Sequence, residues 1–297
     1  MPDPCNGPAP HLVIAGLGYA GTAVARAALG AGWRVTGTAR DPGAAAQPPP
    51  GVAVVAFDAA GPVIAGASHL LVTAAPGEAG DPVIARHRAV LAAAPGLRWI
   101  GYLSTTGVYG DRGGAWVDEN TAPTPGQART RRRLAAEQDW AALAGPRALD
   151  IFRVGGIYGP GRSAFDDVRA GTARRTIRPG HAFSRIHRDD IALAVLAAMR
   201  TAAPGGRRVL HLVDDEPSES ATVIEAAARM LGMDPPPAIP FEEAAQTMSP
   251  MALSFWSENR RVANAATKAA LGLSWRYPTY REGLVAILAE ERAEGAS

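Results

Sequence analysis

Gly16-Leu17-Gly18-Tyr19-Ala20-Gly21 is a G-x-G-x-x-G turn between an apolar run at 12–15 and an alanine-rich helical pattern that extends to Leu29. In such a strand–turn–helix unit, the first glycine permits a tight turn, the second lets a diphosphate approach the backbone, and the third allows close packing. N–H groups at the start of the helix favour phosphate. A purely structural strand-to-helix turn is the alternative. The expected dinucleotide contacts are Gly16, Gly18, Tyr19, Ala20 and Gly21.

Further apolar runs alternate with helical patterns along the chain, which predicts parallel strands joined by helices. The other expected strands are 34–38, 52–57, 69–74, 98–103, 148–154 and 208–213. The expected helices include 82–93, 127–143 and 191–200, the last with Asp189-Asp190 as its N-cap. The predicted fold class is therefore α/β, a doubly wound parallel sheet (Rossmann) with a smaller, discontinuous substrate-side region.

The alternation of strands and helices weakens after Tyr158 and resumes briefly before 213. We therefore expect a dinucleotide-binding domain made of residues 11–157 and 187–213. The substrate-side region would comprise residues 158–186 and 214–297.

Composition narrows the choice of partners. The 297 residues are 47% hydrophobic and carry a net charge of +2 without long basic blocks, which argues against nucleic acid and anionic membranes as partners. Cys5 is the only cysteine, so neither an intramolecular disulfide nor a thiolate zinc cluster can form. No basic segment precedes the apolar stretch at 11–29, as a secretion signal would require. We expect a cytoplasmic protein with a small-molecule substrate and no metal site, either a monomer or a homodimer.

The residues after the second expected strand bear on the choice of dinucleotide. Thr38 is small and Arg40 offers a guanidinium suited to a 2′-phosphate, which favours NADP(H); NAD remains possible because Asp41 follows. Asp58 could accept from the adenine edge or could cap a loop. Small side chains beside the cofactor are expected at Ala74, Ala75 and Pro76.

Several segments resemble the extended and atypical short-chain dehydrogenases/reductases, a family that includes epimerase-like proteins. The resemblance covers most of the chain and includes Tyr102 to Gly110, which ends V-Y-G, and the segment Phe152 to Gly161. It implies that the hydroxyl of Thr105 polarises a substrate carbonyl. Tyr109 of V-Y-G is a second catalytic candidate, although packing beside the nicotinamide is its alternative role.

One departure from this family concerns its Y-x-x-x-K pair, which supplies the acid–base tyrosine and its lysine. Alignment puts Arg133 at the lysine and Arg129 at the tyrosine. The only lysine is Lys268, and Asn264 stands four residues before it. Arg133 could still hold the cofactor ribose, but a guanidinium cannot take up a proton at neutral pH. His187 is another candidate for proton transfer, with a hydrogen-bonded structural role as its alternative.

Two functions are compatible with these residues. The first is an NADP(H)-dependent oxidoreductase or epimerase-like enzyme acting on a small carbonyl or nucleotide-sugar-like substrate, with Thr105, Tyr109 and Arg133 as its catalytic residues. The second is a non-catalytic NADP(H)-binding regulatory or sensor protein, which the arginine at position 129 favours.

Overall fold

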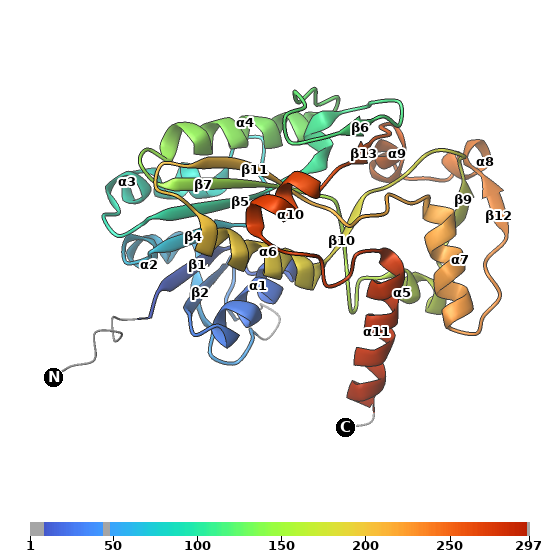
Figure 1. Cartoon of the computed structure of the whole chain (residues 1–297), viewed down its shortest axis with the longest axis horizontal. Helices are drawn as coiled ribbons and strands as arrows, with labels where there is room; N and C mark the ends of the chain where they lie inside the picture. The colour runs from blue at the N-terminus through green and yellow to red at the C-terminus, as the bar shows by residue number, and fades with distance from the viewer. Residues whose placement is uncertain (1–8, 44–47, 296–297) are drawn as a thin grey trace. The chain divides into compact units, whose positions relative to one another are not determined.

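The computed structural model describes residues 9–43 and 48–295 and contains a seven-stranded parallel sheet (Figure 1). Its strand order is β3-β2-β1-β4-β5-β7-β11. The bounds are His11–Ala15 (β1), Arg34–Ala39 (β2), Ala53–Ala56 (β3), His69–Val72 (β4), Trp99–Thr105 (β5), Ala148–Val154 (β7) and Arg207–Leu212 (β11). β1 pairs in parallel with β2 and with β4, so the strand order reverses beside β1. Sheets of this kind bind ligands at that reversal. The α/β class and the doubly wound sheet are confirmed.

Helices lie on both faces of this sheet (Figure 1). Their bounds are Tyr19–Gly30 (α1), Gly61–Ala65 (α2), Pro82–Ala93 (α3), Ala128–Leu143 (α4) and Arg188–Thr201 (α6). Apolar side chains of α2, α3 and α4 form one core with those of the strands, and Trp140 is its largest member. β1, β4 and β7 are buried along their whole length, as parallel strands covered on both faces require.

The N-cap prediction for the helix near residue 191 is wrong. α6 begins at Arg188, so Asp189 and Asp190 lie in its first turn. The Asp190 carboxylate accepts hydrogen bonds from the backbone N–H of Arg276 at 2.7 Å and of Tyr277 at 3.0 Å. This aspartate thus fixes a distant loop, a role that sequence position alone does not show.

The chain divides into two units. Unit 1 comprises residues 1–104, 132–152 and 191–210, and unit 2 comprises 105–131, 153–190 and 211–297. Cys5 belongs to the first range but lies outside the described residues. The functional division expected from the sequence, with boundaries near 157, 187 and 213, stays a prediction.

Unit 2 is built from short elements. Its parallel strand pairs are β6 (Trp116–Val117) with β13 (Arg261–Val262), β8 (Gly156–Tyr158) with β10 (Arg185–His187), and β9 (Arg175–Ile177) with β12 (Ala238–Pro240). Its helices include α5 (Ala164–Arg169), α7 (Ser220–Met230), α8 (Phe241–Ala245), α9 (Pro250–Trp256), α10 (Ala265–Leu271) and α11 (Tyr280–Gly295). Side chains of α5, α7 and α11 share one apolar core. Across residues 9–43 and 48–295, every helix falls short of the length and hydropathy that a membrane span needs.

A glycine in α11 permits a very close contact within this unit. The ring of Tyr158 lies against Gly283, and a Cβ atom at Gly283 would stand 2.1 Å from the Tyr158 hydroxyl oxygen. Tyr158 is itself buried, so it has little room to move. Any larger residue at position 283 would therefore push the helix or the ring away.

We expect Gly283→Ala to lower the free energy of unfolding by about 1–3 kcal/mol, because its methyl group overpacks this contact. Gly30→Ala at the end of α1 is the matched control, since a Cβ there meets nothing within 4 Å. That control should leave stability unchanged or raise it by about 0.4–1 kcal/mol. Urea denaturation of both variants measures the difference, and equal midpoints would contradict the packing argument.

Candidate functional site

The three glycines of the turn in unit 1 have three different surroundings. Gly16 has a φ of +106°, which favours glycine, and a Cβ there would lie 2.7 Å from the Thr73 hydroxyl oxygen. A Cβ at Gly21 would lie 2.7 Å from the carbonyl oxygen of Gly16. A Cβ at Gly18 would meet nothing within 4 Å. Gly16 and Gly21 are therefore needed by the fold, whereas Gly18 faces open space.

β2 holds the turn from one side. The N–H of Gly16 donates to the Thr38 hydroxyl at 3.0 Å, and the N–H of Leu17 donates to the Thr38 carbonyl at 2.8 Å. Thr38 is only 1% exposed. Thr38 thus positions the glycine turn. The sequence prediction used only the small size of Thr38, which leaves space for the cofactor.

α1 begins at Tyr19, directly after Gly18, so Tyr19, Ala20 and Gly21 form its first turn. No acidic side chain lies in that turn. Backbone N–H groups and the helix dipole make such an end attractive to anions. The open side of Gly18, a helix start without negative charge and a turn held by β2 fit the diphosphate of a nicotinamide dinucleotide.

The other expected cofactor contacts surround this turn. Ala74 follows β4, and its N–H donates to Ala15 in β1 at 3.2 Å. Ala75 is exposed and Pro76 half-buried, so small side chains lie at this end of the sheet. Arg40 is exposed directly after β2, while Asp58 forms an exposed ion pair with Arg86 at 3.2 Å. The adenine contact of Asp58 and the phosphate contact of Arg40 stay predictions.

Arg133 lies in α4 and reaches the end of β5 within unit 1. One of its terminal nitrogens donates to the carbonyl of Leu103 at 2.9 Å and to the Tyr102 hydroxyl at 3.3 Å. These two bonds engage a single nitrogen of a guanidinium that has five N–H donors. The remaining donors suit ribose hydroxyls, although the ribose contact itself stays a prediction.

Thr105 ends β5 and belongs to unit 2. Its hydroxyl oxygen accepts from the N–H of Gly107 at 3.1 Å and so caps a short 3₁₀ helix, η2 (Thr106–Tyr109). The start of α4 packs beside η2, because a Cβ at Gly107 would lie 2.8 Å from the Thr130 methyl group. The hydroxyl hydrogen of Thr105 remains able to donate to a substrate oxygen or nitrogen.

Arg129, at the tyrosine position, stacks on α9. Its guanidinium carbon lies 4.2 Å from the ring centroid of Phe255, and a terminal nitrogen lies 3.0 Å from the sulfur of Met251. Phe255 is 55% exposed, which makes this face of α9 an exposed apolar surface. Among the described residues, no carboxylate oxygen lies within 4.0 Å of Arg129. Its positive charge is thus available to an anionic ligand.

Tyr109 lies in a buried polar cluster of unit 2 and is 0% exposed. Arg153 donates to its hydroxyl at 2.8 Å, and His211 Nε2 lies 2.5 Å from it. His211 Nδ1 donates to the Ala263 carbonyl, and burial lowers the pKa of this histidine, so its neutral Nε2 accepts from Tyr109. This environment favours the positioning role that the sequence left open for Tyr109. The cluster itself was not foreseen.

His187 is also buried, with 1% of its surface exposed. Its ring packs against Tyr158 and Tyr277 at centroid distances of 5.3 and 4.3 Å. Burial lowers its pKa to about 4, and its Nδ1 accepts from the N–H of Asp189. A neutral imidazole enclosed by two aromatic rings argues against His187 as the proton-transfer group.

Solved structures match 95% of the chain, although no family model matches it. A conserved protein of unknown function from Silicibacter pomeroyi is 44% identical, with a TM-score of 0.87 over 95% of this chain and 99% of that one. A structure from Methylobacillus flagellatus, named as an NAD-dependent epimerase/dehydratase, is 26% identical with a TM-score of 0.72, over 95% and 99%. The chain has the fold of the NAD-dependent epimerase/dehydratase-like proteins, the extended short-chain dehydrogenases/reductases. The resemblance drawn from the sequence is thereby confirmed at the level of the fold, and the missing Y-x-x-x-K pair is a departure from the pattern of that family.

A curated relative adds a named activity. A 3-diazoavenalumate denitrifying reductase from Streptomyces is 34% identical over 177 residues, which are 55% of this chain and 54% of that protein. The chain thus spans about half the length of the curated relatives it matches. Solved structures that are 17% identical and share the fold include complexes with NAD and with NADPH.

We expect Gly18→Val to weaken NADPH binding at least tenfold without loss of stability. The backbone of Gly18 has a φ of −93° and a ψ of −164°, which valine adopts readily, and its side chain would enter the open space above the turn. Fluorescence titration with NADPH and thermal denaturation measure the two effects.

Gly21→Ala is the control for this experiment, because its methyl group would strike the Gly16 carbonyl and should lower the melting temperature. Unchanged NADPH affinity in Gly18→Val would contradict the placement of the diphosphate at this turn.

Proposed function

We propose that the chain is an NADP(H)-dependent reductase of a small electrophilic substrate. The observation that carries this proposal is the open side of Gly18 at the start of α1, between two glycines whose Cβ atoms would collide with their neighbours. A diphosphate needs bare backbone of this kind. The exposed guanidinium of Arg40 after β2 supports the cofactor that bears a 2′-phosphate.

Two further side chains are assigned roles in the proposed reaction. In unit 1, Arg133 offers its unengaged N–H donors to the cofactor ribose. In unit 2, the Thr105 hydroxyl, whose oxygen accepts from the N–H of Gly107, is proposed to orient the group that is reduced. The reduced cofactor, when bound, supplies a hydride.

The missing tyrosine restricts the substrates that fit. A carbonyl that accepts a hydride also needs a proton, which the family tyrosine would provide. Arg129 holds that position, and a guanidinium does not release a proton near neutral pH. The arrangement therefore favours a substrate whose reduction consumes no proton.

Aryl diazonium acids form such a class, and the curated relative is named as a reductase of a diazo compound. One hydride added to the terminal nitrogen of Ar–N₂⁺ gives the diazene Ar–N=N–H, which becomes Ar–H and N₂ without an external proton. A carboxylate on the same molecule would find in Arg129 a cation that has no carboxylate partner within 4.0 Å among the described residues. Small carbonyls and nucleotide sugars are the competing substrates.

The decisive experiment mixes the full chain with NADPH, confirms binding by fluorescence, and then follows absorbance of the reduced nicotinamide. The panel contains a carboxylated aryl diazonium salt, aldehydes, ketones and nucleotide sugars. Gly18→Val measures the uncatalysed reaction of the reactive diazonium salt. We expect oxidation of NADPH and release of N₂ with the diazonium acid only. Binding without oxidation of NADPH by any substrate would contradict the reductase and support the NADP(H)-binding regulatory alternative.

Arg40→Ala should weaken NADPH binding about tenfold and leave NADH binding unchanged, since it removes the cation expected at the 2′-phosphate. Arg26→Ala on the exposed face of α1 is the control. Equal losses for NADPH and NADH, or no loss, would show that Arg40 does not read the phosphate.

Thr105→Ala should lower kcat by about 10- to 100-fold with unchanged NADPH affinity, because the hydroxyl is proposed to act on the reacting group. Thr105→Ser retains the hydroxyl and should keep most of the activity. If Thr105→Ala loses activity only in proportion to a loss of stability, the hydroxyl serves the turn rather than the reaction.

A further inference from the structure

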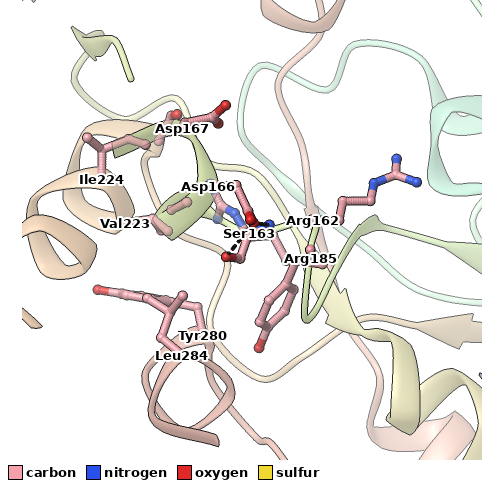
Figure 2. Close-up of a pocket in the computed structure, with 13 residues that line it drawn as sticks. Arg162, Ser163, Asp166, Asp167, Arg185, Val223, Ile224, Tyr280 and Leu284 are labelled. Atoms are coloured by element: carbon pink, nitrogen blue, oxygen red, sulfur yellow. Dashed lines mark hydrogen bonds between the residues drawn. The ribbon is translucent and has the colours of Figure 1, made fainter. Parts of the chain in front are cut away.

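Unit 2 contains a cavity of about 380 Å³ between α5, α7, α11 and the start of β10 (Figure 2). Its size is within the range of pockets that hold small organic molecules. Thr105, Tyr109 and Arg129 do not line it. It is therefore separate from the part of the proposed active site that unit 2 carries.

The wall of this cavity includes the half-buried side chain of Arg185. One terminal nitrogen of Arg185 donates to the backbone carbonyls of Phe183 and Ser218, both at 2.9 Å. Among the described residues, no carboxylate oxygen lies within 4.0 Å of Arg185. Since arginine stays protonated in proteins, the cavity wall carries a positive charge without a direct counter-ion.

Asp214 is a neighbouring carboxyl group and is 1% exposed, but its oxygens lie more than 4.0 Å from the Arg185 guanidinium. Burial raises the pKa of Asp214, whereas Arg185 and nearby backbone N–H groups oppose that rise. The Arg185 guanidinium thus makes no direct ion pair and can still pair with a negative group in the cavity.

Tyr280 adds an unused hydrogen-bond donor to the same wall. Its side chain is 1% exposed, yet its hydroxyl has no partner. The Tyr158 hydroxyl, also at the cavity, donates only to the Thr279 carbonyl at 3.4 Å. A buried hydroxyl without a partner destabilises the fold, so its presence at a cavity points to a ligand that accepts from it.

The remaining lining includes an apolar side, the carboxylates of Asp166 and Asp167, and the side chain of Arg162. Val223 and Ile224 from α7 and Leu284 from α11 supply the apolar side, as Figure 2 shows. The Asp166 carboxylate accepts from the backbone N–H and the hydroxyl of Ser163, the bond drawn in Figure 2. Its charge is thus directed to the start of α5 and is partly satisfied there.

We propose that this cavity binds a small organic acid, whose carboxylate accepts hydrogen bonds from Arg185 and Tyr280 and whose short apolar chain lies on Val223, Ile224 and Leu284. The ligand occupies a second site, distinct from the proposed reductase site.

Calorimetric titration of the full chain with 4-methylpentanoate tests the proposal. The neutral 4-methylpentanamide, which has nearly the same shape, should bind at least tenfold more weakly. Inorganic phosphate should not compete. Equal binding of acid and amide, no binding of the acid at tens of millimolar, or binding of phosphate alone would overturn the proposal.

Tyr280→Phe should weaken the acid about tenfold, and without ligand it should raise the melting temperature because it removes an unpartnered hydroxyl. Tyr277→Phe, which removes a hydroxyl elsewhere in unit 2, should leave the affinity unchanged. Arg185→Met should abolish binding. Where Arg185→Met does not fold, Tyr280→Phe alone decides, since unchanged affinity there would contradict the proposed contact.

Discussion

Two hydrogen bonds from the glycine turn to Thr38 hold the part of the molecule on which a dinucleotide site depends. They join the turn after β1 to the end of β2, and Gly37 beside them must lack a side chain because a Cβ would lie 2.8 Å from Leu17. Gly16 is likewise enclosed by Thr73, after β4. Because contacts from two neighbouring strands hold the turn, the backbone around Gly18 is fixed, and the open space beside Gly18 is already formed at this edge of the sheet. A ligand there would pay little conformational entropy to order the backbone.

The sequence predicted the sheet and the glycine turn well, because both arise from short-range patterns. Continuous apolar runs identify buried parallel strands, and three glycines within six residues act in one local unit. Interactions between distant segments could not be found in this way. Arg129 meets Met251 across 122 residues, and Tyr109 meets His211 across 102. A single sequence shows neither contact, so the surroundings of Arg129 and Tyr109 became known only from the structure.

The start of α6 shows the same limit on a smaller scale. Two adjacent aspartates before an apolar helix are typical of an N-cap, and the sequence favoured that role. The carboxylate of Asp190 instead accepts from Arg276 and Tyr277, a loop some 86 residues later. Side chains that satisfy backbone N–H groups do so wherever the fold brings those groups, and local spacing cannot tell a helix start from a distant loop.

The two units alternate along the sequence. The chain passes from one unit to the other after residues 104, 131, 152, 190 and 210. β5, β7 and β11 each run from one unit into the other without a break. No single cut in the gene can therefore release either unit as a continuous polypeptide. During synthesis, the early segments of each unit cannot complete their packing until the later segments have been made. A truncated chain therefore lacks part of both units.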